Sequence, residues 1–388
     1  MTPPIAILGA GPSGLTLGRL LQVANIPFVI FEQDESAIAA ATVATGRGGA
    51  LDIHADSGQI ALKEAGLLDQ FKSIARYDAT ITVANAKGKV YLKVEHEGGD
   101  NDKPEIDRRD LRALLVNSIP ANRVQWGFKV QSVQKETDGS MSIHFQDGRI
   151  ESGFKLVVGA DGMWSKVRSL VTSAKPQYSG IYYLTTAIQP ESPFHSSVVS
   201  LAGNGLYMAI GDGKQIVILK LGDGSYYIGF GLRLPENWSS EQAALIKDSS
   251  ALRQWLLSDG FADWPEAHTD VIRHSDGDFY VWPLYAMPTE SLSWQTVPGV
   301  TLIGDAAHVT TPFVGEGVNC ALYDSLRLAQ QIIKHGLDDL HRAVSEYEAS
   351  MLPRGIDLIE RSTKSGELYF ASDAPKGWLK TFAGIDIA

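Results

Sequence analysis

Hydrophobic residues at the start of the chain occur in two short runs that flank a helical pattern. The runs at residues 5–8 and 28–31 predict strands, and leucines recur at helical spacing over residues 15–21. A strand, a helix and a second strand in this order predict a βαβ unit with parallel strands.

The middle of the chain has a different pattern. From about residue 178 to 285, β-branched and aromatic residues dominate, with strand-like runs at Leu206–Ile210, Gln215–Leu221 and Tyr226–Leu234. Gly-Asp-Gly separates each run from the next, and Asp-Gly between such runs is a strong hairpin signal. This region therefore predicts a mainly antiparallel sheet, with a helix around residues 240–257.

The last part of the chain returns to the first pattern. Residues 300–304 form an apolar run, a helix is expected from Gly315-Glu316-Gly317, and residues 338–371 have helical spacing. The predicted fold class is α/β: a Rossmann-like domain with an inserted, mainly antiparallel β-sheet domain and a long C-terminal helix. The expected divisions are 1–76, 104–172 and 294–335 for the Rossmann-like domain, 77–103 and 173–293 for the sheet domain, and 336–388 for the helical segment.

Composition and charge narrow the class of protein. The 388 residues carry a net charge of -11, which argues against nucleic acid or an anionic membrane surface as the main partner. No apolar run approaches the ~20 residues of a membrane span. The first strand begins by residue 5, which leaves no room for a signal peptide, and the only cysteine is Cys320. We expect a cytoplasmic protein without a metal site.

A glycine-rich turn follows the first strand, at Gly9–Gly14 (GAGPSG). In a dinucleotide-binding fingerprint, Gly9 would allow the tight turn, Gly11 would let a pyrophosphate approach, and Gly14 would let the helix pack on the strand. Glu32 ends the second strand, where an acid can bind ribose hydroxyls.

A second nucleotide signature lies at Val300–Asn319 (VTLIGDAAHVTTPFVGEGVN). The helix expected at Gly317 would direct its backbone N–H groups and positive dipole end toward an anionic group. Asp305 ends the preceding strand and can accept hydrogen bonds from a sugar or ribityl hydroxyl. Its alternative role is to cap the following loop.

These two motifs and a third, GADGMWSKVR at Gly159–Arg168, resemble those of class A FAD-dependent aromatic monooxygenases of the para-hydroxybenzoate hydroxylase fold. The stretches Gly48–Gln59 and Ile106–Ser118 look most like the tetracycline-inactivating flavin monooxygenases. The resemblance implies an enzyme that uses FAD, NADPH or NADH, and O₂ to hydroxylate an electron-rich polycyclic, aromatic or enolic small molecule, with tetracyclines as candidates. It also implies a monomer.

The resemblance implies a set of cofactor contacts, with Glu32 on the adenosine ribose, Arg108 and Arg112 on the phosphates or ribityl region, and Asp305 on the ribityl chain. The full predicted set is Gly9, Gly11, Pro12, Ser13, Gly14, Glu32, Arg47, Gly49, Asp52, Arg108, Arg112, Asp161, Gly304, Asp305, Pro312, Gly315, Gly317, Val318 and Asn319. No catalytic side chain is expected, because the flavin performs the chemistry. Asp161 could equally be a helix N-cap.

The candidate substrate contacts are Tyr207, Met208, Phe230, Phe313 and Val314. For the four that are aromatic residues or methionine, a core role is the default expectation. The chain departs from the tetracycline-inactivating pattern in two places. Thr45 stands where an arginine is usual, which leaves Arg47 as the nearest cation, and Leu184 and Gly205 stand near the family's glutamine and arginine.

Three further expectations concern alternatives. His308 is expected to fix its loop rather than to act as a base. The same cofactor domain could belong to an FAD-dependent reductase or halogenase, although the tryptophan-rich halogenase motif is absent from the sequence. A flavin- or drug-binding protein without turnover is the alternative from another class.

Overall fold

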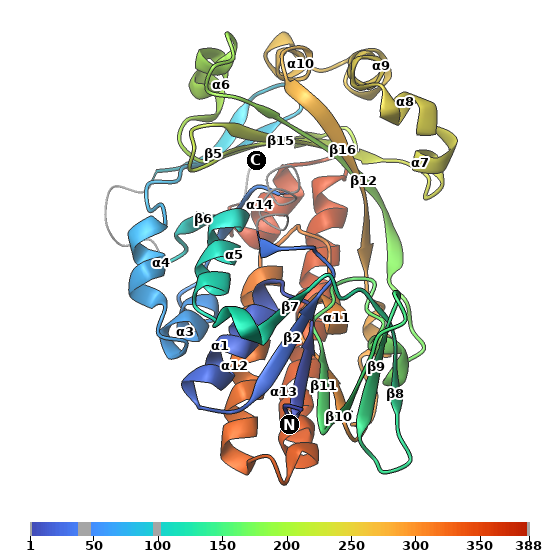
Figure 1. The fold of residues 1–388 in the computed structure, drawn as a ribbon. Helices are drawn as coiled ribbons and strands as arrows, with labels where there is room; N and C mark the ends of the chain where they lie inside the picture. The colour runs from blue at the N-terminus through green and yellow to red at the C-terminus, as the bar shows by residue number, and fades with distance from the viewer. Residues whose placement is uncertain (1, 38–47, 96–101, 386–388) are drawn as a thin grey trace.

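The computed structural model describes residues 2–37, 48–95 and 102–385. A parallel sheet of five strands lies beside the N-terminus, in the lower part of Figure 1, in the order β17-β11-β1-β2-β7. Its central strands read as unbroken apolar runs because both faces are buried, as is usual for parallel sheets. The strands are β1 (Ile5–Leu8), β2 (Phe28–Glu32), β7 (Val124–Trp126), β11 (Leu156–Gly159) and β17 (Val300–Leu302).

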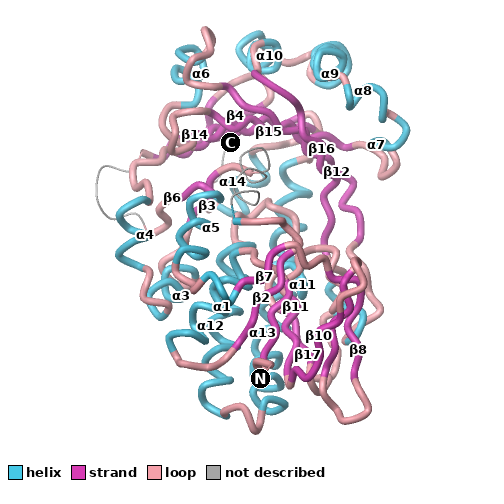
Figure 2. The backbone as a smooth tube through the Cα atoms, in the orientation of Figure 1, coloured by secondary structure: helices cyan, strands magenta, loops and turns pink. Residues whose placement is uncertain are grey.

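Helices pack around this sheet, and the longest come from the end of the chain. The predicted long C-terminal helix is confirmed as α13, which has 30 residues. The helices of this part are α1 (Pro12–Val23), α3 (Gly58–Glu64), α4 (Leu68–Ile74), α5 (Arg108–Asn117), α11 (Asp305–His308), α12 (Gly317–His335), α13 (Leu340–Tyr369) and α14 (Lys376–Phe382). Figure 2 shows α1, α12 and α13 together beside the parallel strands.

Two small sheets complete this part of the molecule. One is a three-stranded antiparallel sheet in the order β10-β9-β8. The other pairs β3 with β6 in antiparallel fashion, which joins segments more than fifty residues apart in the sequence. Their strands are β3 (Ala50–Asp52), β6 (Glu105–Asp107), β8 (Val130–Lys135), β9 (Met141–Phe145) and β10 (Ile150–Phe154).

A seven-stranded sheet lies at the opposite end, in the order β16-β12-β15-β14-β13-β4-β5. The predicted mainly antiparallel sheet is confirmed, since β13 and β4 form its one parallel pair among the described strands. Asp212 and Gly213 both have positive φ (52° and 71°), as a tight hairpin turn between β13 and β14 requires. The strands are β4 (Ile81–Asn85), β5 (Val90–Val94), β12 (Gln177–Ile188), β13 (Leu206–Gly211), β14 (Lys214–Lys220), β15 (Tyr226–Arg233) and β16 (Asp276–Ala286).

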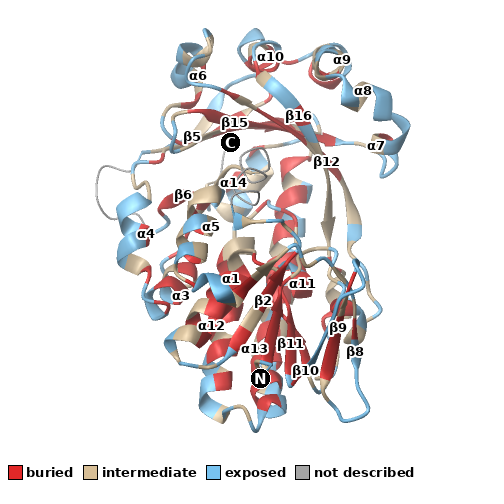
Figure 3. Cartoon of the chain, viewed as in Figure 1, coloured by how far each residue is buried: buried red, intermediate tan, exposed pale blue. Residues whose placement is uncertain are grey.

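The two faces of this sheet belong to two different cores. Tyr207 and Phe230 pack on the face covered by α6 (His195–Ala202), α9 (Ser249–Trp255) and α10 (Glu266–Arg273). Met208 packs on the other face, with Phe313 and the end of α13. Successive residues of a strand point to opposite faces, so neighbours such as Tyr207 and Met208 separate. Figure 3 shows buried residues on both sides of the sheet.

The single helix expected around residues 240–257 is wrong in detail, because this segment forms separate short helices. They are α7 (Trp238–Glu241), α8 (Ala243–Lys247) and α9, followed by a π-helical turn at Leu256–Gly260. The backbone leaves helical geometry at Asp248 (φ -110°, ψ 99°), whose side chain accepts hydrogen bonds from Ser250 N and Ala251 N. Asp248 therefore begins a new helix instead of continuing the previous one.

No helix among the described residues combines the length and apolar character needed to cross a membrane.

Replacing Phe230 with alanine tests the position of this residue in the helix-covered core. The ring is fully buried, so Phe230→Ala should lower the free energy of unfolding by about 3–5 kcal/mol. FAD affinity should stay within about twofold, because the ring faces away from the parallel sheet. Urea denaturation and FAD titration measure the two effects. Loss of FAD binding without loss of stability would contradict this assignment.

Candidate functional site

The turn after β1 has the close backbone packing that its glycines predict. A β-carbon added to Gly9 (φ 112°) would lie 2.3 Å from the Ala160 carbonyl oxygen, and one added to Gly14 would lie 2.0 Å from the Gly9 oxygen. A β-carbon on Gly11 would have no atom within 4 Å. The turn is therefore tightly packed at Gly9 and Gly14 and open at Gly11, where a ligand can approach the N-terminus of α1. Pro12 begins that helix.

Glu32 lies beside this turn at the end of β2. Its buried carboxylate accepts hydrogen bonds from Ala10 N at 2.5 Å and from Asp34 N at 3.0 Å. Arg112 of α5 reaches the same place: Nε donates to the Ala10 oxygen at 3.0 Å, and Nη2 lies 2.9 Å from Asp34 Oδ2 and 3.7 Å from Glu32 Oε2. The predicted Glu32 and Arg112 are thus neighbours across the glycine turn.

The three sequence motifs meet at the carboxyl ends of β1, β11 and β17, which are adjacent strands. Ser325 of α12 donates a hydrogen bond to the Ser13 carbonyl oxygen at 2.8 Å. Arg168, which is buried, donates to the carbonyl oxygens of Asp305 at 2.9 Å and Ala306 at 2.8 Å. A β-carbon on Gly304 would lie 3.2 Å from Ser13 Oγ. Segments almost 300 residues apart therefore form one site.

Asp305 and Arg108 face this site from different elements. Both side chains are exposed in the chain by itself, although protein surrounds them on most sides. This enclosure raises the pKa of the Asp305 carboxyl above its ordinary value, and the nearby charges of His308, Arg108 and Arg168 oppose the rise. Arg108 extends from the first residue of α5 against Gly48, where a β-carbon would lie 2.3 Å from Arg108 Cδ.

A buried ion cluster supports the Gly304–Asp305 turn from behind. Asp324 accepts hydrogen bonds from Gly304 N at 2.9 Å, His308 Nε2 at 2.6 Å and Arg354 Nη2 at 2.8 Å. His308 Nε2 also lies 3.8 Å from the Cys320 sulfur. His308 is buried at the end of α11 and bonds Asp324 of α12, so it ties the two helices together, in line with the expected structural role. Asp324 and Arg354 were not predicted from the sequence. The one sequence signal for them was Asp324 itself, an acidic residue on the mostly apolar face of the expected helix α12.

The pKa directions in this cluster agree with an ion pair. Burial alone would lower the pKa of the His308 imidazole, but Cys320 and Asp324 raise it well above its ordinary value of 6.5. Burial would raise the pKa of Asp324, but His308 and Arg354 outweigh it and hold that pKa below the ordinary 3.8. Asp324, His308 and Cys320 could together reach one metal ion, but the Arg354 guanidinium already occupies one oxygen of Asp324.

The start of α12 lies against β3. The Asn319 side-chain amide donates a hydrogen bond to the backbone carbonyl oxygen of Asp52 at 2.8 Å and accepts one from the backbone N–H of His54 at 2.8 Å. The backbone around Gly315, Gly317 and Val318 is open to the predicted cofactor contact, since a β-carbon on Gly317 would have no atom within 4 Å. The Asp52 carboxylate bonds His54 Nε2 at 2.9 Å.

Asp161 accepts a hydrogen bond from Lys166 N at 2.7 Å through Oδ2. Its other oxygen is buried and has no hydrogen-bond partner among the described residues. The alternative N-cap role is not seen, because Asp161 makes a turn contact and no helix begins directly after it. A buried carboxylate oxygen without a partner is the feature expected where a ligand is to bind.

The remaining predicted cofactor residues vary in position. Pro312 is exposed in the loop before α12. A β-carbon on Gly49 would lie 2.8 Å from Leu219 Cδ2 and 3.4 Å from Tyr227 Cδ1, so this segment touches the seven-stranded sheet. Arg47 lies outside the described residues.

The candidate substrate residues do not all face the site. Met208 and Phe313 pack together on the sheet face toward the parallel sheet, and Val314 is half-buried beside Phe313. Tyr207 and Phe230 are a correction: they lie in the helix-covered core, and the Tyr207 hydroxyl bonds His268 Nε2 at 2.8 Å. Residue type alone suggested a pocket for them, but the alternation of side chains along each strand turns both away from it.

Other residues of the inward face were missed for the same reason. Tyr227 forms a hydrogen bond with Thr185, and burial raises the pKa of its hydroxyl to about 12. Trp282 Nε1 donates to Thr185 Oγ1 at 3.2 Å, and the Tyr183 hydroxyl bonds Gln215. These residues lie on the same sheet face as Met208. Side chains alternate between faces along each strand, so the inward position of Met208 and the strand pairing identify them.

A cavity of about 430 Å³ opens between the seven-stranded sheet and the start of α5. Gly48, Arg108 and Tyr227 line it together with strand ends of the sheet. A cleft between a nucleotide-binding part and a second sheet is a common ligand site. Arg108 and Tyr227 thus approach one space from opposite sides.

Comparison with known proteins agrees with this geometry. The FAD binding domain family matches residues 2–218 and 266–362. Monooxygenase penA of Penicillium thymicola is 31% identical over 375 residues and covers 84% of each chain. Monooxygenase asqM of Emericella nidulans is 28% identical over 431 residues, which cover 95% of this chain and 96% of the relative.

Solved structures share the fold. HpxO of Klebsiella pneumoniae, crystallised with FAD and uric acid, aligns with a TM-score of 0.79 at 21% identity, over 98% of this chain and 93% of that one. The tetracycline destructase Tet(55) aligns with a TM-score of 0.72 at 19% identity, over 96% and 91%. The predicted class A flavin monooxygenase fold is confirmed. The chain belongs to the FAD binding domain family and is an enzyme of its monooxygenase branch.

Replacing Asp324 with asparagine tests the ion cluster. Asp324→Asn leaves His308 and Arg354 without their buried counter-charge and should lower the free energy of unfolding by about 3 kcal/mol or more. The His308 contribution is complete below pH 6.5 and is lost as pH rises through its raised pKa; the Asp324 contribution is present above pH 3.8 and is lost as pH falls through its lowered pKa. The difference in unfolding free energy between the wild type and Asp324→Asn should therefore be largest between pH 3.8 and pH 6.5.

Urea denaturation at several pH values measures this difference. Asp338→Asn is the matched control, because the Asp338 side chain is fully exposed, and it should change stability by less than about 0.5 kcal/mol. Equal effects of both variants, or a difference that grows steadily above pH 8, would contradict the assigned ion pair.

Proposed function

We propose that this enzyme uses FAD, NADPH or NADH, and O₂ to hydroxylate an electron-rich aromatic, polycyclic or enolic small molecule. The observation that carries the proposal is the convergence of the three motifs beneath the inward face of the seven-stranded sheet. The end of the parallel sheet has the groups that suit a dinucleotide, and the inward face of the seven-stranded sheet has tyrosines, a methionine and a tryptophan that suit a flat, mostly apolar substrate.

The residues fit FAD in several ways. The N-terminus of α1 is open at Gly11, which suits a pyrophosphate. Glu32 and Arg112 lie beside that turn and would hold the ribose and the phosphates, while Asp305 would hold the ribityl chain and Arg108 would approach from α5. The buried Asp161 oxygen without a partner is a further group that a ligand would satisfy.

When bound, FAD would supply the redox chemistry and the activation of O₂. The chain's own contribution would be binding, orientation and exclusion of water. The N-terminus of α12 has a positive dipole end that favours negative charge nearby. Glu316, directly before that helix, is held by Arg361 through two bonds of 2.7 and 2.6 Å, which fixes the loop there.

The substrate is expected to lie on the inward face of the sheet. Tyr227, Tyr183 and Trp282 offer aromatic rings there, and their polar atoms already bond Thr185 and Gln215. The two positions that would grip a tetracycline offer nothing to it: Leu184 is buried on the helix side, and a β-carbon on Gly205 would lie 2.1 Å from the Thr80 oxygen. Only the fold shared with the tetracycline destructases therefore supports tetracyclines as candidate substrates.

We also retain three other proposals from the sequence. The enzyme works as a monomer, in the cytoplasm, and its partners are the small-molecule substrate and O₂. The lone, buried Cys320 suits a reducing compartment, and the acidic net charge argues against nucleic acid as a partner.

Purified protein should be yellow and should oxidise NADPH or NADH faster when its substrate is present. A panel of polycyclic phenols, aromatic acids and tetracyclines, analysed by oxygen electrode and mass spectrometry, tests the reaction. Substrate-dependent oxygen uptake with a product heavier by one oxygen atom supports a hydroxylase. A reduced product without added oxygen would favour a reductase, and chlorinated or brominated product would favour a halogenase.

Replacing Asp305 with alanine tests the cofactor placement. Asp305→Ala removes a hydrogen-bond acceptor for the ribityl chain and should weaken FAD binding by about 10- to 100-fold. Flavin fluorescence titration measures the dissociation constant. Asp338→Ala, at a fully exposed position, should leave it unchanged. Equal FAD affinity in Asp305→Ala and the wild type would overturn this placement.

A further inference from the structure

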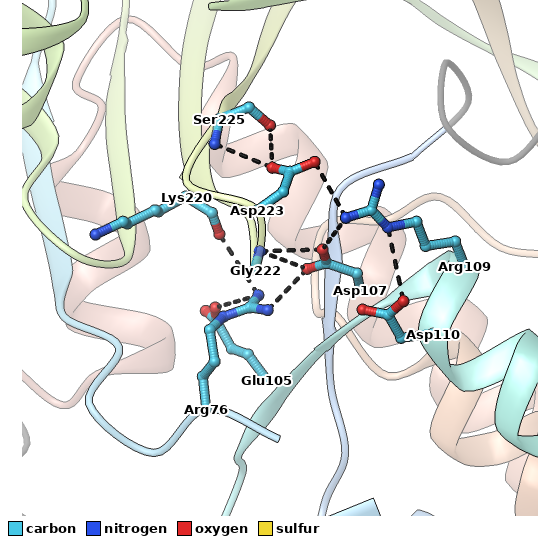
Figure 4. Close-up of polar contacts among 9 residues, drawn as sticks. All are labelled: Arg76, Glu105, Asp107, Arg109, Asp110, Lys220, Gly222, Asp223 and Ser225. Carbon is cyan, nitrogen blue, oxygen red and sulfur yellow. Dashed lines mark hydrogen bonds and ion pairs between the residues drawn. The ribbon is translucent and has the colours of Figure 1, made fainter. Parts of the chain in front are cut away.

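A network of ion pairs and hydrogen bonds joins the start of α5 to the turn between β14 and β15 (Figure 4). It connects three segments that are distant in the sequence and that belong to both halves of the cleft. Its members are Arg76, Glu105, Asp107, Arg109, Asp110, Lys220, Gly222, Asp223 and Ser225.

Asp107 is the centre of this network. It is 3% exposed, and its carboxylate accepts hydrogen bonds from Arg76 Nη1 at 2.8 Å and from Gly222 N at 3.0 and 3.2 Å. Asp107 directly precedes α5, where an aspartate usually caps its own helix. Its side chain makes no capping bond here, so the carboxylate serves the contact with the sheet.

Gly222 allows the turn to approach this carboxylate. A β-carbon on Gly222 would lie 2.9 Å from Arg76 Nη1 and 3.3 Å from Asp107 Oδ2. Arg76 also lies 3.4 Å from Glu105 and 3.5 Å from the Lys220 oxygen. Burial raises the pKa of Glu105 to about 7, so at neutral pH that group carries only part of its charge and Asp107 is the main counter-charge to Arg76.

The network stands next to the proposed FAD contact. Arg108 follows Asp107 directly and begins α5. The surrounding protein lowers the pKa of its guanidinium, and the charge of Asp305 offsets only part of this lowering. Tyr227 lies on β15, just past the turn that Asp107 holds. Asp107, Arg108 and Tyr227 all line the cavity of about 430 Å³. A single buried carboxylate therefore contacts both walls of this cavity.

We propose that Asp107 is a positioning residue that couples the FAD site to the substrate sheet. By holding the turn at Gly222, it sets where Arg108 stands relative to Asp305 on one side and Tyr227 on the other. The inference rests on the proposed contact between Arg108 and FAD.

The neighbouring ion pair provides a matched control. Arg109 Nη2 lies 3.0 Å from Asp223 Oδ2, in the same turn as Gly222, but the two side chains are 34% and 42% exposed. Exposed pairs of this kind contribute little. Arg109 Nη2 also lies 3.7 Å from Asp107 Oδ2, so Asp223→Asn alters the same turn while the bonds of Asp107 to Arg76 and Gly222 stay in place.

Asp107→Asn should weaken FAD binding by about tenfold, within the usual range for coupled sites. In the wild type, FAD should slow hydrogen exchange of the amides of residues 220–225, and in Asp107→Asn this protection should disappear. Gly222→Ala breaks the same contact from the sheet side and should weaken FAD binding similarly. Asp223→Asn should change it by less than about twofold.

Fluorescence titration and hydrogen-exchange mass spectrometry measure these effects, with Arg108→Ala as the reference. Wild-type FAD affinity in Asp107→Asn or Gly222→Ala would overturn the coupling, as would an equal loss in Asp223→Asn. If Asp107→Asn does not fold, Gly222→Ala decides alone. If Arg108→Ala binds FAD normally, the proposed Arg108 contact fails; if only Arg108→Ala weakens binding, the contact stands and the coupling fails.

Discussion

The close approach of backbone to backbone at the carboxyl end of the parallel sheet is the constraint on which the rest of the structure depends. The Gly9 turn packs against the Ala160 carbonyl, and Gly14 packs against Gly9, at distances that no side chain permits. This packing leaves the N-terminus of α1 open beside the ends of β11 and β17. Every other group of the site is arranged around that opening.

Buried charges hold the surrounding loops in place. The Asp324 carboxylate accepts a hydrogen bond from the backbone N–H of Gly304 and so fixes that turn. Arg168 donates to the next two carbonyl groups, those of Asp305 and Ala306. Asp107 does the same for the turn of the seven-stranded sheet. In each case a charged side chain bonds backbone of a distant segment, so the loops of the cleft depend on a few buried groups and not on their own local propensity.

The division of the seven-stranded sheet into two faces explains how one element serves two purposes. Its outer face forms a hydrophobic core with the short helices α6 to α10 and supplies stability. Its inner face keeps polar groups among its aromatic rings, such as Thr185 between Tyr227 and Trp282. Hydrogen bonds among these side chains satisfy groups that would otherwise be costly to bury, which leaves the face ready to receive a mostly apolar ligand.

The sequence by itself determined the βαβ unit at the start, the mainly antiparallel middle sheet, the long C-terminal helix, the glycine turns and the family, because these depend on local periodicity and on short motifs with strict steric needs. It placed Gly9, Gly14 and Glu32 at the turn, and their neighbours across the fold agree with this. Only the tertiary structure decided that Tyr207 and Phe230 face a helix-covered core, that the Asn319 amide bonds strand β3, and that Asp324 and Asp107 bond distant turns. Such roles arise from contacts between segments up to about 270 residues apart, such as Asn319 with Asp52, and no local pattern encodes which partner a buried polar group will meet.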